Sequence, residues 1–134
     1  MTRLRQDQPL IDDTTRELLS SLLRDWHGRG WVSGTGGGIC GPTQDGNLFL
    51  APTGVHKELV RPDDFFVVSP ADGRVVREPK TPGLRPSECN SIFCLIWRER
   101  DARSVAHSHS LSAVLAGDVA DEVFVISIFF IDLI

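Results

Sequence analysis

The chain has 134 residues, of which 41% are hydrophobic and 24% are charged, and its formal net charge is −4. This length and balance suit one globular domain with a buried core, so we expect residues 1–134 to form a single domain. The acidic balance and the lack of a Lys/Arg cluster argue against a nucleic-acid partner.

The N-terminal part of the chain predicts an amphipathic helix that begins at Thr14. Thr14 and Glu17 have the spacing of a capping box. Apolar side chains then recur every three or four residues, at Leu18, Leu19, Leu22, Leu23 and Trp26. Gly28 and Gly30 are expected to end this helix.

A glycine-rich loop and several short strands follow this helix. The run Ser33–Gly38 contains four glycines, which disfavour the interior of a helix or strand. Residues 47–51 read as a strand after an Asp-Gly turn, and Pro52–Gly54 breaks it. Residues 64–69 and 75–76 read as a hairpin around the turn at 71–74.

The second half of the chain alternates helices and strands. Three prolines make residues 79–86 a loop, and apolar spacing predicts a helix over 88–100. Residues 103–107 read as a strand, Ser110 as the cap of another helix, and residues 123–130 as a last strand. This alternation indicates a layered α/β or α+β domain.

Two further features bear on location. The apolar run at 123–134 is shorter than the roughly 20 residues that a membrane span needs, and no secretory signal is recognisable, so we expect no membrane association. Cys40, Cys89 and Cys94 are odd in number and scattered, which favours reduced thiols in a cytoplasmic protein.

The strongest chemical pattern is the histidine pair His107 and His109. Two histidines separated by one residue on an extended segment point to the same side, so both imidazoles can meet one zinc ion. Such pairs also occur by chance on protein surfaces, where they bind no metal. A catalytic zinc needs a third protein ligand.

Two turns are candidates for holding an anion. The backbone N–H groups of Ser33–Gly38 are suited to cradle a phosphate, although the run also suits a plain connector. Thr53 and Gly54 offer a hydroxyl and an unhindered N–H in a second turn, with Lys57 nearby.

These pieces together resemble the methylthioribulose-1-phosphate dehydratase family of the class II aldolase/adducin superfamily. The resemblance rests on four blocks in order: Gly30–Ile39, Leu50–Glu58, Ser87–Cys89 and His107–Ser110. It covers about Thr14 to Ala116, which is the front part of the family's domain.

The resemblance implies a three-layer αβα domain and a zinc-dependent hydro-lyase of methionine salvage. The family removes water from 5-methylthioribulose 1-phosphate to give a diketone phosphate, and its members are commonly cytoplasmic homo-tetramers. His107 and His109 match two of three zinc ligands, and Cys89 matches a substrate-contacting cysteine. The substrate's phosphate is expected at Gly36, Gly37, Gly38, Thr53, Gly54 and Ser87.

The sequence departs from the family at its C-terminal end. The third histidine of the family lies downstream of residue 134, and no glutamate follows the histidine pair where the family's catalytic glutamate belongs. Asp132 is near that place but is not a trusted substitute. We therefore expect the chain to be truncated, with residues 128–134 as an atypical tail.

Two alternatives remain open. Glu88 occupies the position of the catalytic glutamate in class II sugar-phosphate aldolases, which makes it a candidate acid/base, although a glutamate near a helix start is also favoured by the helix dipole. With only two zinc ligands, the chain is also compatible with an inactive adducin-like module or pseudoenzyme. Cys89 and the glycine block favour the dehydratase.

Overall fold

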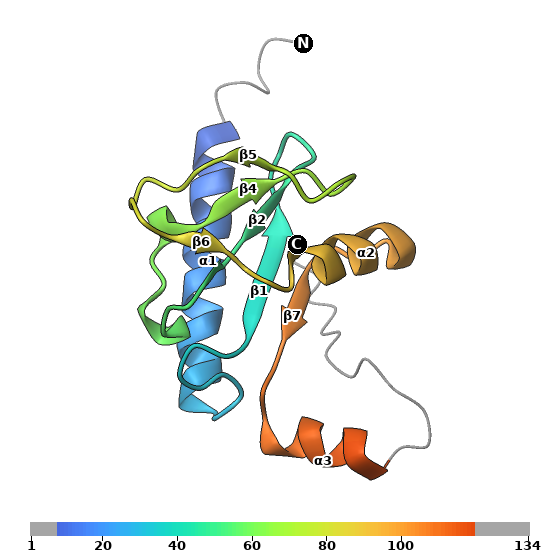
Figure 1. The fold of residues 1–134 in the computed structure, drawn as a ribbon. Coiled ribbons are helices and arrows are strands. Elements are labelled where there is room, and N and C mark those ends of the chain that lie inside the picture. The colour runs from blue at the N-terminus through green and yellow to red at the C-terminus, as the bar shows by residue number, and fades with distance from the viewer. Residues whose placement is uncertain (1–7, 120–134) are drawn as a thin grey trace.

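The computed structural model describes residues 8–119 of the chain. Three helices, seven short strands and two 3-10 turns make up this part of the chain (Figure 1). They are, in chain order, α1 (Gln8–Gly28), β1 (Gly38–Pro42), β2 (Leu48–Leu50), β3 (Pro52–Thr53), η1 (Lys57–Leu59), η2 (Pro62–Asp64), β4 (Phe66–Val68), β5 (Val75–Arg77), β6 (Arg85–Pro86), α2 (Asn90–Arg100), β7 (Val105–His107) and α3 (Leu111–Val119).

Five of the strands form one sheet in the order β5-β4-β2-β1-β7, and each neighbouring pair is antiparallel. Within it, β1 pairs with β2 on one side and with β7 on the other. The pairing of Gly38 with His107 places the end of the glycine loop beside the histidine segment. A separate two-stranded sheet is formed by β3 with β6.

The sheet lies between two helical layers. Alternate residues along each strand face opposite sides of the sheet, so each strand contributes side chains to both layers. Ile39, Phe49 and Val67 pack with α1, whereas their neighbours Cys40, Leu50 and Phe66 pack with α2. All six side chains are almost fully buried. The predicted three-layer α/β fold is thus confirmed, with α1 on one face and α2 on the other (Figure 1).

The prediction that the first helix begins at Thr14 is wrong, since α1 already includes Gln8 and Thr14 lies inside it. A contact that the local pattern does not reveal supports the earlier turns: the Asp12 carboxylate accepts a hydrogen bond from the N–H of Gln44 at 3.0 Å.

The predicted end of the helix is confirmed. Gly30 has a φ of +74° and its N–H donates to the carbonyl of His27. The N–H of Trp31 donates to the carbonyl of Trp26, which completes a Schellman motif.

The sequence did not predict the two-residue strands β3 and β6, which lie where we expected a strand break and a loop. It also did not predict β1. Its first residue, Gly38, belongs to the run that we expected to be loop, and Gly41 and Pro42 also disfavour a strand. A Cβ on Gly41 would lie 3.1 Å from Cδ2 of Leu19, so the missing side chain lets α1 lie close to the sheet. Tertiary packing and pairing on both edges therefore override the weak local preference.

The other elements predicted within residues 8–119 are confirmed, and their bounds differ from the predicted ones by at most two residues. Ser110 caps α3, because its Oγ accepts the N–H of Ala113 at 3.2 Å. The predicted strand at 123–130, the tail at 128–134 and Asp132 lie outside the described residues, so these expectations and the single domain over 1–134 stay predictions. Within residues 8–119, no helix has the length and apolar character of a membrane span.

Candidate functional site

His107 and His109 lie at the end of β7, where the chain leaves the sheet. Their ring centroids are 4.6 Å apart and the ring planes are tilted by 56°. His107 is half-buried and His109 is exposed, so the pair opens to solvent on one side. Burial, the neighbouring His109 and the charge of Lys57 lower the pKa of His107, which favours the neutral imidazole that binds metals.

The segment after β7 is held by the carbonyl of Trp31, just beyond the end of α1. This oxygen accepts hydrogen bonds from the N–H of His109 at 2.7 Å and from Oγ of Ser108 at 3.0 Å. The Ser108 Oγ also accepts the N–H of Ser110 at 3.1 Å. Both residues that follow His107 along this turn are thereby fixed.

The glycine loop packs directly against the histidines. A Cβ on Gly36 would lie 2.7 Å from Nδ1 of His109, and a Cβ on Gly37 would lie 2.9 Å from the carbonyl oxygen of His107. Gly37 also has a φ of +84°, which disfavours other residues. The glycines are therefore required for close approach to His107 and His109.

Cys89 reaches the histidine pair from the start of α2, on the face of the sheet opposite α1. It is the N-cap residue of α2, and its Sγ lies 3.6 Å from Nδ1 of His107. Its own N–H donates to Oγ of Ser87 at 3.2 Å, while the carbonyl of Ser87 accepts the N–H of Asn90. Ser87 thus fixes the turn that carries Cys89.

The second predicted turn joins the same region through β3 and β6. Thr53 pairs with Arg85, two residues before Ser87. Gly54 has a φ of +70°, and a Cβ there would lie 3.5 Å from the Arg85 guanidinium. The predicted phosphate residues of the turn and of the segment before α2 are therefore neighbours.

Lys57 links the two predicted anion loops. Its side chain is buried, and Nζ donates to the carbonyl of Thr35 at 3.0 Å and to that of Val55 at 3.2 Å. The sequence placed a lysine near the second turn but gave no sign of its contact with the glycine loop. The signal in the sequence was a lysine three residues after Gly54.

Glu88 is exposed and precedes the N-cap of α2, so it is the chain neighbour of Cys89. The role predicted for it stays a prediction. The other two cysteines are structural: Cys40 and Cys94 are buried in the α2 side of the core. Burial raises the pKa of Cys40 to about 12, so its thiol stays protonated at neutral pH.

The donor set partly fits a divalent metal. His107 and His109 supply two adjacent imidazoles, and a thiol lies next to one of them. Among residues 8–119, however, no group of three His, Cys, Asp or Glu side chains is arranged to hold an ion. The described residues therefore supply two imidazole ligands suited to a divalent metal, and a complete metal site would need further ligands.

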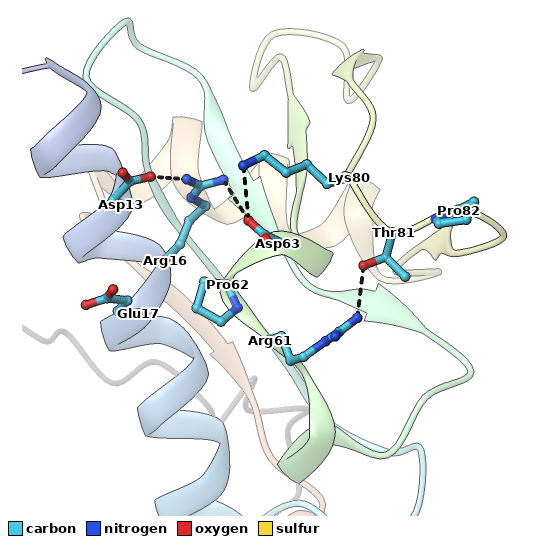
Figure 2. A pocket seen from close by; sticks show the side chains of 9 residues that line it. All are labelled: Asp13, Arg16, Glu17, Arg61, Pro62, Asp63, Lys80, Thr81 and Pro82. Atoms are coloured by element: carbon cyan, nitrogen blue, oxygen red, sulfur yellow. Dashed lines mark hydrogen bonds and ion pairs between the residues drawn. The ribbon is translucent and has the colours of Figure 1, made fainter.

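A separate pocket of about 700 Å³ lies between α1 and the segments around η2 and Lys80 (Figure 2). Neither histidine of the pair lines it. Asp63 lies 3.9 Å from Arg16 and 3.6 Å from Lys80, and Arg61 donates to Thr81. Because Arg16 and Lys80 both face Asp63 and neither histidine lines the pocket, we regard it as a salt-bridged groove separate from the predicted site.

Comparison with known proteins identifies the relatives of this chain. The family profile described as "Class II Aldolase and Adducin N-terminal domain" matches residues 17–126. The chain is 41% identical over 108 residues to the "Probable methylthioribulose-1-phosphate dehydratase" of Drosophila grimshawi, covering 80% of this chain and 46% of that protein. It is 38% identical over 125 residues to the methylthioribulose-1-phosphate dehydratase of Komagataella phaffii, covering 91% and 51%.

Solved structures show the same fold. An aldolase II superfamily protein from Pseudomonas syringae has a TM-score of 0.67 at 17% identity, covering 79% of this chain and 43% of that one. The L-fuculose-1-phosphate aldolase of Thermus thermophilus has a TM-score of 0.65 at 21% identity, covering 81% and 52%. The chain spans about half the length of the curated relatives that it matches.

Proposed function

The chain belongs to the class II aldolase and adducin family, and from this we propose that it dehydrates 5-methylthioribulose 1-phosphate to a diketone phosphate. Relatives at 38–41% identity named as methylthioribulose-1-phosphate dehydratases support this choice of reaction. The carrying observation is the 3.6 Å contact between Cys89 Sγ and Nδ1 of His107, because it joins the dehydratase-type cysteine to the histidine pair.

In this proposal His107 and His109 hold a zinc ion together with a ligand from outside the described residues. A zinc ion supplies Lewis acidity, which lowers the pKa of protons next to a carbonyl group that it polarises. The lowered pKa of His107 keeps its imidazole neutral and free to act as a ligand.

The remaining residues bind and orient the substrate. The backbone N–H groups of Gly37, Gly38 and Gly54, with the hydroxyls of Thr53 and Ser87, bind the phosphate. Gly36 lies beside this anion site, and its own N–H donates to the carbonyl of Ser33 within the loop. Cys89 contacts the sugar end beside His107. Binding of the phosphate far from the breaking bond supplies the energy that positions the reacting carbons.

Glu88 is the candidate acid/base residue in the described part of the chain. Glu88 is exposed one residue before Cys89, and at this position it would also suit the acid/base role of a class II sugar-phosphate aldolase. Aldol cleavage is therefore the second candidate reaction, and this placement of Glu88 is the observation that favours it. An inactive adducin-like module is the non-enzymatic alternative.

The same proposal places the protein in methionine salvage in the cytoplasm and makes it a homo-oligomer, a tetramer in its family. Exposed apolar side chains support an association surface on α3, where Leu111, Val114 and Leu115 are 72%, 54% and 54% exposed.

An assay of the purified chain with zinc separates the candidates. We expect 5-methylthioribulose 1-phosphate to lose one water and L-fuculose 1-phosphate to remain intact. Cleavage of fuculose phosphate without dehydration would assign the chain to the aldolases. No turnover of either compound, with zinc far below one ion per chain, would favour the inactive module.

A further inference from the structure

Lys57 carries a buried positive charge between the two predicted anion loops. The residue is 2% exposed, although lysine is among the side chains least often buried. Its Nζ donates to the carbonyl of Thr35 in the glycine loop and to that of Val55 in the second turn. The two loops are thus joined through one ammonium group.

No carboxylate among residues 8–119 lies within 4.0 Å of this ammonium group. The adjacent carboxylate, Glu58, instead lies 3.5 Å from Nδ1 of His27 and 3.4 Å from Nδ1 of His56. The two carbonyl groups satisfy hydrogen bonds but supply no countercharge. Because a buried unpaired charge is costly, a buried lysine without a carboxylate is an unusual arrangement that favours binding of an anion nearby.

The charge of Lys57 interacts with two residues of the proposed site, Cys89 and His107. Burial lowers the pKa of Lys57, and the nearby Cys89 thiol opposes that shift. The same lysine contributes to the lowered pKa of His107. Lys57 therefore lies within electrostatic reach of both groups that form the proposed substrate pocket.

We propose that Lys57 is the positioning residue of an anion site, which ties the glycine loop to the second turn and supplies the positive charge that attracts a phosphate group. The ligand class is a phosphate monoester, and the identification of its sugar rests on the proposed function. The anion itself is bound by loop N–H groups that Lys57 holds in place.

Three variants of the full chain separate the charge from the tie between the loops. Lys57→Gln keeps a donor without the charge, Lys57→Arg keeps both, and Lys80→Met removes an exposed lysine from the other pocket. Binding of inorganic phosphate is measured by titration calorimetry, and folding by the melting temperature. We expect Lys57→Gln to bind phosphate about tenfold to a hundredfold more weakly.

Lys57→Arg is expected to restore most of the affinity, and Lys80→Met to bind phosphate like the parent chain. Equal affinity in Lys57→Gln and the parent chain would overturn the inference, as would an arginine variant no better than the glutamine variant. So would a parent chain that does not bind phosphate. Phosphate binding requires no turnover, so Lys57-dependent binding in a chain without dehydratase activity would remove only the proposed function.

Discussion

Sγ of Cys89 and Nδ1 of His107 are 3.6 Å apart, although Cys89 precedes α2 at its N-cap position and His107 ends β7. The contact exists because α2 covers the face of the sheet opposite α1 and begins beside the end of β7. The N-cap residue of that helix therefore meets the first histidine of the pair. Packing brings the thiol to the histidine pair, because no local sequence pattern joins Cys89 to His107, 18 residues later in the chain.

Removal of either histidine is predicted to abolish tight zinc binding. Changes around metal ligands already weaken metal affinity by about 10- to 100-fold, so His107→Ala and His109→Ala should each cost at least about 100-fold. Zinc content after dialysis, measured by elemental analysis, checks this. His56→Ala is the control, because His56 lies in another turn next to Glu58. Unchanged zinc content in both site variants would contradict the assignment.

Gly36→Ala is predicted to disturb His109 without unfolding the chain. The added Cβ would lie 2.7 Å from Nδ1 of His109, so the ring must shift from its position. We expect zinc affinity to fall while the melting temperature changes little. Gly28→Ala is the matched control, since nothing lies within 4 Å of a Cβ at Gly28. Equal zinc affinity in the two variants would show that the glycine is not needed for the histidine geometry.

The sequence predicted those parts of the fold that have local causes. Apolar spacing predicted α1 and α2, and the glycine at residue 30 predicted the helix end that its φ of +74° confirms. β1 was not predicted, because Gly38, Gly41 and Pro42 disfavour strands locally. Pairing with β2 and β7 and the close packing of Leu19 determine that strand, and these contacts depend on the tertiary fold.

The candidate site also has one part with a local cause in the sequence and one part that depends on the tertiary fold. The spacing of His107 and His109 is local, and it correctly indicated two neighbouring imidazoles. Lys57 contacts Thr35 of the glycine loop, which lies 22 residues earlier in the chain. This contact depends on how the two turns pack against each other. No periodicity encodes such a contact.

Cysteine alkylation is predicted to occur first at Cys89. Cys40 and Cys94 are buried, whereas Cys89 is half-buried. With its pKa raised to about 12, Cys40 has a thiolate fraction of only about one in ten thousand at pH 8. Iodoacetamide treatment of the folded chain at pH 8, followed by peptide mass spectrometry, gives the order. Faster labelling of Cys40 than of Cys89 would contradict the difference in burial between the two thiols.

Leu23→Ala is predicted to lower the free energy of unfolding by about 2–5 kcal/mol, because a fully buried leucine leaves a cavity. Leu18→Ala on the same helix is the control. Leu18 is 36% exposed, so its truncation should cost less than about 1 kcal/mol. Urea denaturation of both variants measures the difference. Similar losses would mean that α1 does not present Leu23 to the sheet.

The last prediction concerns the apolar surface of α3. Leu111 and Leu115 are four residues apart and lie on one side of the helix, where they are 72% and 54% exposed. An apolar surface of this kind favours association, so Leu111→Ser with Leu115→Ser should shift the chain towards monomers. Light scattering after size-exclusion chromatography measures the mass over a range of concentrations. Val76→Ser, on β5 and 45% exposed, is the control and should leave the mass unchanged. A parent chain that is monomeric at every concentration would rule out α3 as an association surface, because the serine substitutions would then have no assembly to disrupt.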